Sequence, residues 1–503
     1  MTKQSASIQI LDLGGLPTLP HQRLSMRVES LIRRAILSGN LAAGARLPAS
    51  RVLARDLKMS RHTVEHAFDQ LVAEGFLVRR RGSGTYVASD VPERERAPRP
   101  VKRHHQPLTV APTLSRRGAI IEAYPGHRVP LIGTAFTPSI PALDLFPRQV
   151  WGRLMSRAIS RPGVDALAYG ASGGLPELKR AIAAHVAGSR AVACVPDQII
   201  VTSSAQQAVD LVARVLLDPG DAVWVEDPCY QPVTHLLRAA GGIVNPIPVD
   251  ADGLEADAAL AIAPAARLAY VTPSHQYPSG GLMSLPRRLA LLAWAERHRG
   301  WIIEDDYDGD LRYAGRPLAS LQALDPAGRV IYVGTFNKMM FPALRLAYLV
   351  APLALVDPFL AAKHLMDGHA PGHTQTALAA FIEDGHLATH LRRLVGEYDL
   401  RRRALLGALE PLSDELDPGP SDAGLHLSVY LRRHSDDRGI SAECAKAGVY
   451  LDPLSRFYLG RSRPGFVMGF ACSRPARTRA AMQIVARVIH AQPAASTRIK
   501  VVR

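Results

Sequence analysis

The stretch VIYVGTFNKMMFPALR, residues 330–345, begins with apolar or β-prone residues and continues into a short loop that holds a lysine. Residues 330–333 predict a buried strand, which Gly334 and Thr335 end. Lys338 follows among apolar neighbours, and such a setting disfavours its charged form and frees its amine to condense with an aldehyde. A lysine at a strand end can also simply extend to solvent, so the other strand ends decide between the two interpretations.

Four other apolar runs end in polar or hydroxyl-bearing residues in the same way. They are residues 199–201, 223–225, 268–271 and 301–303, which the segments TSSAQ, EDPCY, TPSHQ and EDDY follow. Beyond residue 117 such strands alternate with helical segments, and this alternation predicts an α/β fold with a mostly parallel sheet. Ligands of these sheets bind beyond the carboxyl ends of the strands, so the five loops are expected to form one site.

The groups in these loops are the ones that pyridoxal 5′-phosphate needs. Lys338 would form a Schiff base with its aldehyde, and Asp305 would keep the pyridine nitrogen protonated, which makes the ring an electron sink. Tyr307, two residues later on the same side of an extended chain, would hydrogen-bond the phenolic oxygen of the ring. Tyr230 would stack on the ring face. Each residue type alone is commoner in a core, a cap or a turn, but five fitting strand ends favour the cofactor.

The cofactor phosphate would lie at the start of a helix expected over residues 207–217. The backbone N–H groups that open this helix belong to Ser204, Ala205 and Gln206. The N-terminus of a helix attracts anions, because its first N–H groups have no partner within the helix. Thr335 and Arg345 would complete the phosphate site from the loop that holds the lysine.

The N-terminal part of the chain has the element order of a winged helix. Apolar residues recur at three- and four-residue steps over residues 21–40, which predicts an amphipathic helix. A short second helix is expected from the segment LPAS at 47–50, and a third begins at Ser60, a good N-cap, and runs to Leu71. Residues 76–87 predict a β-hairpin with a basic tip, which is the wing.

This arrangement predicts how DNA would be bound. The third helix would enter the major groove by its N-terminal residues, which are Ser60, Arg61, His62 and Thr63. At the tip of the hairpin, Arg81 and Gly82 would lie against the DNA backbone or the minor groove. A small helical domain with a solvated basic face is the alternative, but element order, turn chemistry and charge agree on DNA binding.

The distribution of charge also favours a polyanionic partner. The chain carries 60 Lys and Arg against 45 Asp and Glu, and residues 1–103 hold 18 of the former against 9 of the latter. A fifth of the chain thus carries most of the excess positive charge, which points to nucleic acid. At 503 residues with 47% hydrophobic content, the chain is long enough for one large core and a smaller domain.

Cysteine use and hydropathy indicate a cytoplasmic protein. The four cysteines lie far apart without a CxxC spacing, so neither a disulfide framework nor a metal site is expected. We find no apolar run of about 18 residues, and residues 1–10 lack a basic segment followed by an apolar core. A membrane span is therefore not expected.

Composition also marks the domain boundaries. Residues 89–117 are rich in Pro, Arg, Glu and His and lack hydrophobic periodicity, so they are expected to form a semi-rigid linker. The linker separates a DNA-binding domain, expected over residues 18–88, from the α/β domain, expected over residues 118–492.

The N-terminal block resembles the winged-helix DNA-binding domain of the GntR superfamily. The motifs are LPxSRxLA at 47–54, SRxTV at 60–64, EG at 74–75 and GSGT at 82–85. The superfamily positions that contact DNA match Arg51, Arg61, Thr63 and Gly82. Glu65 departs from the pattern, since relatives often have a basic residue there, so the base preference stays open.

Residues 130–490 resemble the fold-type I, aspartate aminotransferase-like enzymes. The motifs are YxxxGGLPxLK at 169–179, AQQAxDL at 205–211, PGD at 219–221, EDPxY at 226–230, HQxPxG at 275–280, DDYD at 305–308 and GTFxK at 334–338. The resemblance implies a large α/β domain with a small C-terminal α+β subdomain at about 390–492. It also places His275, Gln276 and Asn337 at the cofactor, and Tyr169 at the cofactor phosphate of a partner subunit.

With the winged helix in front, the chain is similar to the MocR/GabR family of transcriptional regulators, in which an aminotransferase-like domain acts as a sensor. The resemblance implies a homodimer that binds a double-stranded DNA operator. It also implies a small effector, which would be an amine, an amino acid or pyridoxal phosphate itself. A DNA-binding protein whose large domain only dimerises is a further alternative, but it leaves Lys338, Asp305 and Tyr307 without a reason.

A catalytically active aminotransferase is the main alternative to a sensor. These enzymes bind the substrate carboxylate with an arginine shortly before a closing apolar segment, and the segment FVMGFA at 466–471 contains none. Arg456, Arg461 and Arg463 lie upstream and are candidates for that role. We therefore expect a cofactor site without steady turnover, and no particular substrate.

Overall fold

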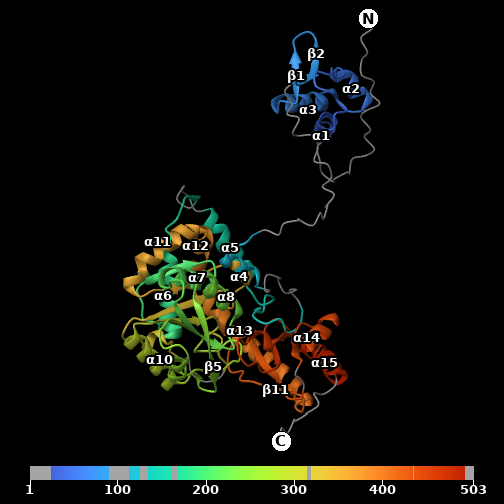
Figure 1. The fold of residues 1–503 in the computed structure, drawn as a ribbon. Helices are drawn as coiled ribbons and strands as arrows, with labels where there is room; N and C mark the ends of the chain where they lie inside the picture. Colours follow the sequence, from blue (N-terminus) through green and yellow to red (C-terminus); the bar gives the residue numbers. More distant parts are fainter. Residues whose placement is uncertain are drawn as a thin grey trace. The chain divides into compact units, whose positions relative to one another are not determined.

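The computed structural model describes residues 24–89, 113–124, 134–160, 167–313, 319–433 and 436–492. The chain divides into two compact units, one within residues 1–113 and one within residues 114–503 (Figure 1). Residues 18–23 of the expected DNA-binding domain, and residues 90–112 of the expected linker, lie outside the described residues.

In its described residues, the first unit has three helices and a two-stranded hairpin. Its elements are α1 (Leu24–Leu37), α2 (Ser50–Asp56), α3 (Arg61–Ala73), β1 (Leu77–Arg80) and β2 (Gly84–Val87). One apolar face of each helix forms a common core, with Ile32 of α1, Leu53 of α2 and Phe68 of α3 all buried. The three- and four-residue spacing of apolar residues brings these side chains together.

Local turn chemistry fixes the helix-turn-helix and the wing. The hydroxyl of Ser60 accepts a hydrogen bond from the Thr63 backbone N–H at 3.1 Å, so Ser60 caps α3 as expected. β1 and β2 pair antiparallel with Arg80 opposite Gly84. Gly82 has φ +74°, a left-handed conformation that glycine adopts without strain, and it allows the hairpin to turn at its basic tip.

An eight-stranded sheet forms the centre of the second unit. Its strands are β3 (Ile199–Thr202), β4 (Ala222–Asp227), β5 (Ile243–Asp250), β6 (Gly253–Leu254), β7 (Ala266–Val271), β8 (Trp301–Asp306), β9 (Val330–Thr335) and β10 (Ala347–Val350), in the spatial order β3-β10-β9-β8-β7-β4-β5-β6. β9, β8, β7, β4 and β5 run parallel. β10 is antiparallel to both β9 and β3, so β3 runs in the same direction as β9.

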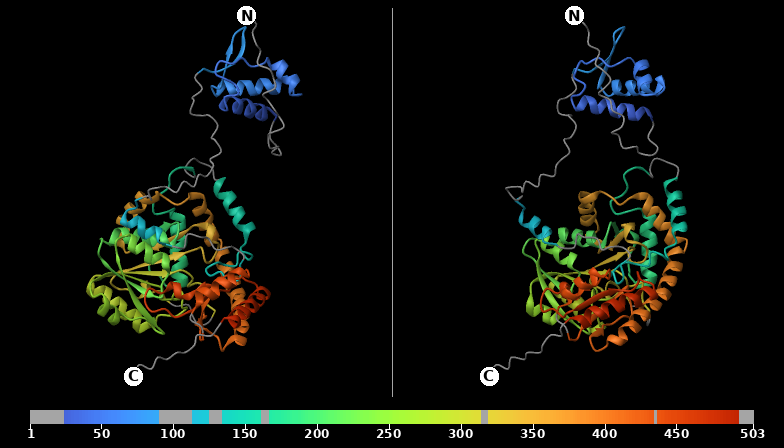
Figure 2. Two further views of the ribbon diagram at one scale, coloured as in Figure 1. Left: turned by 45° about the vertical axis from the view of Figure 1, so that its right-hand side comes forward. Right: turned by 90° about the vertical axis from the view of Figure 1, so that its right-hand side faces the viewer.

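Helices cover both faces of this sheet, as the views of Figure 2 show. They are α4 (Arg116–Glu122), α5 (Arg148–Ile159), α6 (Pro176–Arg190), α7 (Ala205–Leu216), α8 (Gln231–Ala239), α9 (Ala256–Ile262), α10 (Leu285–His298), α11 (Val356–Asp367) and α12 (Gly372–Glu383). In β4, Val223 and Val225 pack in the core formed with α7 and α8, whereas Trp224 stacks on Trp294 of α10 with ring centroids 4.1 Å apart. A strand buried on both faces is apolar throughout, as the sequence runs indicated.

The C-terminal residues form a smaller α+β layer. The long helix α13 (His386–Leu409) leads into β11 (Leu416–Pro418), β12 (His426–Leu431), α14 (Asp437–Lys446), β13 (Asp452–Pro453), β14 (Gly465–Gly469) and α15 (Pro475–Ala491). The four strands pair antiparallel in the order β11-β12-β14-β13. α13 and α15 pack in one apolar core with β12 and β14.

Several element boundaries differ from the sequence predictions, and for three of them the local cause is visible. α7 begins at Ala205, two residues before the predicted start, because Ser204 caps it through a hydrogen bond from the Gln207 N–H. β9 continues through Gly334 and Thr335, which pair with β10 instead of ending the strand. α4 begins at Arg116, inside the predicted linker, since Ser115 caps it.

Within the part of the chain that is described, no helix combines the length and the apolar character that crossing a membrane requires.

We expect Phe68→Ala to destabilise the first unit selectively. Phe68 is 2% exposed, and replacing a buried phenylalanine by alanine typically costs about 3–5 kcal/mol of unfolding free energy. Hydrogen exchange of the full-length chain, followed by mass spectrometry, should become faster in peptides from α1 and α3 and stay unchanged in peptides from the eight-stranded sheet. Met26→Ala is the control, since Met26 is 48% exposed and should change exchange little. Equal effects of the two substitutions would contradict the core assignment.

Candidate functional site

A cavity of about 180 Å³ lies at the carboxyl ends of β3, β7, β8 and β9 in the second unit. It is lined by Ser139, Ser204, Ala205, Gln206, Tyr230, Tyr270, Tyr277, Asp305, Tyr307, Thr335, Asn337, Lys338 and Arg345. The parallel strands bring their carboxyl ends to one edge, so groups far apart in the sequence meet there.

Lys338 follows β9 and points its amine into this cavity. Its Nζ donates a hydrogen bond to the carbonyl oxygen of Ser139 at 3.2 Å. Burial disfavours the charged ammonium and lowers the pKa of Lys338 to about 8, although Asp308 and Asp305 partly oppose this shift. A substantial fraction of the amine is therefore neutral near physiological pH and able to act as a nucleophile.

Asp305 lies at the end of β8 and lines the same cavity as Lys338. One carboxylate oxygen accepts a hydrogen bond from the Tyr270 hydroxyl at 2.6 Å, whereas the other, Oδ1, is buried without a partner in the described residues. Burial raises the pKa of Asp305 to about 6, and the Tyr270 hydrogen bond limits the rise. A buried carboxylate oxygen without a partner is suited to a cationic N–H group of a ligand.

A second part of the cavity wall offers an anion site. The N-terminus of the twelve-residue helix α7 opens onto it, and Ala205 and Gln206 are its first residues. Arg345 borders the same cavity, together with Thr335 and Asn337. The Asn337 Oδ1 atom is buried without a partner in the described part of the chain, and the Thr335 hydroxyl accepts the Asn337 backbone N–H at 3.2 Å.

Aromatic side chains form another part of the cavity wall. Tyr230 and Tyr277 meet edge to face with ring centroids 5.5 Å apart, and Tyr277 makes a similar contact with Tyr307 at 5.7 Å. The hydroxyl of Tyr230 accepts a long hydrogen bond from the Gln206 side-chain amide at 3.4 Å. A flat ring would find stacking partners here, because aromatic rings favour offset and edge-to-face contacts.

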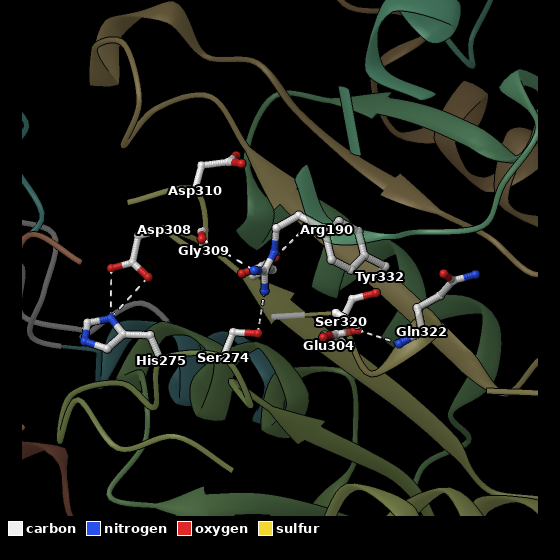
Figure 3. A network of polar contacts seen from close by, with 12 residues as sticks. Arg190, Ser274, His275, Glu304, Asp308, Gly309, Asp310, Ser320, Gln322 and Tyr332 are labelled. Carbon is white, nitrogen blue, oxygen red and sulfur yellow. Dashed lines mark hydrogen bonds and ion pairs between the residues drawn. The ribbon is translucent and has the colours of Figure 1, made fainter. Parts of the chain in front are cut away.

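A buried polar network holds the end of β8 in place (Figure 3). Arg190 of α6 donates from Nε to Asp306 at 2.6 Å and from Nη2 to the Ser274 hydroxyl at 2.6 Å. The Tyr332 hydroxyl donates to the same Asp306 oxygen at 2.7 Å. Because the cation and the carboxylate are both buried and bonded to each other, this pair restrains the strand end that carries Asp305 and Tyr307.

Three residues that the sequence placed at the cofactor lie outside the cavity wall. His275 is buried behind Tyr307, with Nδ1 2.9 Å from the Tyr307 hydroxyl oxygen. The side chain of Gln276 is occupied by the protein, since its amide donates to the carbonyl oxygens of Pro228 and Tyr277 at 2.7 and 2.8 Å. Tyr169 is 97% exposed and is not among the residues that line the cavity of its own chain.

Sequence reasoning missed three residues of the cavity wall. Tyr270 belongs to a predicted apolar strand and Tyr277 to a loop motif, so neither was assigned to the cavity. Ser139 lies in an irregular segment, and its own φ is +64°. The one available signal was Tyr270, which interrupts an otherwise aliphatic buried strand and would be costly there unless its hydroxyl found a partner.

The first unit presents the residues expected at DNA on its surface. Arg51, Arg61, His62, Arg81 and Gly82 are exposed. Ser60 and Thr63 also bond to each other through their hydroxyl groups at 2.7 Å, which places both at the first turn of α3. The departing residue, Glu65, binds Arg79 of the wing strand at 3.0 Å and also the Ser50 hydroxyl.

The residues of the cavity fit pyridoxal 5′-phosphate. The unpaired Asp305 oxygen suits a protonated pyridine nitrogen, the N-terminus of α7 with Arg345 suits a phosphate, and the lowered pKa of Lys338 makes its amine more available to the aldehyde. No group of three or more His, Cys, Asp or Glu residues in the described segments is arranged to hold a metal ion.

Comparison with known proteins agrees with both units. Residues 24–87 match the model of bacterial regulatory proteins of the gntR family, and residues 153–487 match aminotransferase class I and II. The chain is 40% identical over 453 residues to a probable rhizopine catabolism regulatory protein, MocR, of Rhizobium meliloti, which covers 89% of this chain and 90% of that protein. It is 32% identical to the HTH-type transcriptional regulator TauR of Rhodobacter capsulatus, over 88% of this chain and 90% of TauR.

A solved aminotransferase has the same fold as the second unit. LysN, an α-aminoadipate aminotransferase from Thermus thermophilus in complex with N-(5′-phosphopyridoxyl)-L-leucine, is 26% identical with a TM-score of 0.65, and the match covers 71% of this chain and 91% of LysN. The prediction of a fold-type I domain behind a winged helix is thereby confirmed. The chain belongs to the MocR-type transcriptional regulators, in which a GntR-type winged helix precedes an aminotransferase class I and II domain with pyridoxal 5′-phosphate as its cofactor.

Proposed function

We propose that this regulator binds pyridoxal phosphate at Lys338 and senses a small amine, an amino acid or the cofactor itself at the same cavity. The observation that carries the proposal is that one cavity holds both Lys338, whose pKa burial lowers to about 8, and Asp305, one of whose carboxylate oxygens has no partner in the described residues. When bound, the cofactor supplies an aldehyde that can bond either the Lys338 amine or an incoming amine. Replacement of the Lys338 amine by the incoming amine is how the protein would detect it.

The roles of the individual residues follow from their positions. Asp305 would pair with the pyridine nitrogen, and Tyr307 would donate to the phenolic oxygen. The phosphate would be held by Ser204, Ala205, Gln206, Thr335, Asn337 and Arg345. Tyr230 and Tyr277 would enclose the ring between their faces and edges.

The described residues favour sensing over steady catalysis. Arg345 is the single arginine among the described residues that line the cavity, and we assign it to the cofactor phosphate. Arg456 pairs with Asp452 at 2.6 Å, and Arg463 lies over the ring of Tyr430 with its guanidinium 3.7 Å from the ring centroid. Neither is free in this structure to position a substrate carboxylate, which a transaminase needs for repeated turnover.

We further propose that the protein acts as a homodimer on a double-stranded operator. Tyr169 lies outside its own cavity with a fully exposed side chain, which leaves it available to the cofactor phosphate of a second chain. An effector would change operator binding only through a difference in its affinity for the two states of the protein.

The cofactor assignment predicts a spectroscopic result. Wild-type protein mixed with pyridoxal phosphate should show the absorption band of a Schiff base, and borohydride should fix the chromophore to the chain. Lys338→Ala should show neither, because it lacks the amine. If Lys338→Ala retains a band that borohydride fixes, another lysine carries the cofactor and the assignment is wrong.

The lowered pKa of Lys338 predicts the pH dependence of attachment. The neutral amine is the reactive form, so the attachment rate should rise with pH through about 8 and level off above it. Stopped-flow absorbance from pH 6.5 to 10.5, on protein freed of cofactor, measures the midpoint. A midpoint at the ordinary lysine value of 10.5 would show that burial does not lower the pKa of this amine.

The DNA-binding assignment predicts that Arg61→Ala weakens operator binding by about 1–3 kcal/mol, since one arginine contact to a base is worth roughly that much. Binding is measured by fluorescence anisotropy on an operator that the wild-type protein selects from random-sequence DNA. The cofactor spectrum should not change. Arg297→Ala is the control, because it removes the same charge from the surface of α10. Equal losses for the two variants would leave no specific role for Arg61.

A further inference from the structure

His275 and Asp308 form a buried pair behind Tyr307. The His275 Nδ1 atom lies 3.0 and 3.1 Å from the two carboxylate oxygens of Asp308 and 2.9 Å from the Tyr307 hydroxyl oxygen. His275 is 3% exposed and Asp308 is 2% exposed, so water does not compete strongly for these groups. Tyr307 is the one member of the three that lines the cofactor cavity.

This geometry determines which atom carries the proton. An Nδ1 lone pair facing both oxygens of a carboxylate would be repelled, whereas an N–H directed between them is attracted to both. Asp308 therefore holds His275 in the form protonated at Nδ1. A protonated Nδ1 has no lone pair to accept a hydrogen bond from Tyr307, so the Tyr307 oxygen can only accept from His275, and its own proton is free to point into the cavity.

The surroundings leave His275 little room to turn. A Cβ atom on Gly424 would lie 2.2 Å from His275 Cε1 and 2.5 Å from an Asp308 oxygen. The backbone at Gly424 therefore packs closely against both side chains. The ring of His426 is 5.3 Å away, and burial keeps its pKa well below the usual histidine value, so it stays neutral. On the other side, Asp306 and Gly309 are tied to Arg190 (Figure 3).

We infer that His275 and Asp308 are positioning residues that fix Tyr307 as a hydrogen-bond donor to the phenolic oxygen of the cofactor, and that His275 itself does not touch the cofactor. This inference rests on the proposed cofactor site. It assigns to the histidine of the HQxPxG motif a role that acts through Tyr307, and it gives Asp308 a function distinct from that of Asp305.

A donor at the phenolic oxygen favours the deprotonated form of the bound cofactor, because that form carries more negative charge on this oxygen. Loss of the donor should raise the pH midpoint of the absorption change of the bound cofactor. A hydrogen bond to a charged group corresponds to a shift of about one to two pH units. Tyr307→Phe, which removes the hydroxyl entirely, sets the largest shift that the pair could produce.

The experiment compares the pH titration of cofactor absorbance in full-length wild-type protein and variants. His275→Leu and Asp308→Asn should each raise the midpoint in the direction of Tyr307→Phe. Neither should raise it further in a Tyr307→Phe background, since the hydroxyl that they orient is gone. His275→Asn should restore most of the wild-type midpoint, because its amide nitrogen can reach the place of Nδ1.

A second histidine–aspartate pair on the same turn provides the control. His185 Nε2 lies 3.2 Å from an Asp310 carboxylate oxygen and does not hydrogen-bond Tyr307 in the described structure, so His185→Leu should loosen the turn without changing the donor. The inference is overturned if His275→Leu shifts the midpoint no more than His185→Leu does. It is also overturned if His275→Leu shifts the midpoint as much in the Tyr307→Phe background as in the wild-type protein. A third contrary result is that His275→Leu loses the cofactor, whereas His275→Asn keeps it with a midpoint that differs from the wild-type value. Wild-type protein without any titrating band would instead refute the cofactor site itself.

Discussion

The buried carboxylate of Asp305 is the constraint on which the rest of the second unit depends. Removing a carboxylate from water costs several kcal/mol unless other groups compensate, and only one oxygen of Asp305 has a protein partner in the described residues. The pKa near 6 shows that the protein alone compensates incompletely. A cationic nitrogen supplied by a ligand would complete the set, so the cavity favours a protonated aromatic ring over a neutral one.

A buried carboxylate with one unpaired oxygen needs a rigid surrounding structure, and the sheet provides it. Strands buried on both faces cannot shift by one residue without moving apolar side chains to the wrong core. At the end of β8 the pair between Arg190 and Asp306 adds a second restraint, because breaking a buried ion pair leaves an uncompensated charge. Asp305 and Tyr307 thus inherit their positions from neighbours that never reach the cavity.

The site residues that can be predicted from sequence are those whose position is set by the direction of the strands. Lys338, Asp305 and Tyr307 follow parallel strands, and the carboxyl ends of such strands meet at one edge whatever the loops do. The direction of a side chain within a loop is not fixed in this way. His275 and Gln276 were expected at the cofactor, but the turn that holds them sends one behind Tyr307 and the other to backbone carbonyl groups.

Two further limits of sequence reasoning have different physical origins. Tyr270 lies inside a strand, where the sequence can indicate that its buried hydroxyl needs a partner but not that this partner is the Asp305 carboxylate. Ser139 reaches Lys338 from nearly 200 positions away through an irregular segment. Both contacts depend on long-range packing, whereas the winged helix was predictable because caps, turns and apolar spacing within about 65 residues determine it.

A cavity of this kind can serve a sensor with less machinery than an enzyme needs. Catalysis requires that a substrate be held in one reactive orientation over many cycles, which is the task of a free arginine beside the ring. Sensing requires only that an amine bind one state of the protein more tightly than the other. Arg456 is engaged with Asp452, and Arg463 is engaged with Asp417 and Tyr430. The lysine, the carboxylate and the tyrosine proposed to handle the cofactor all line the cavity. Under the proposed function, the site would keep the chemistry that recognises an amine, and Arg345 is the one arginine of the described residues that lines the cavity.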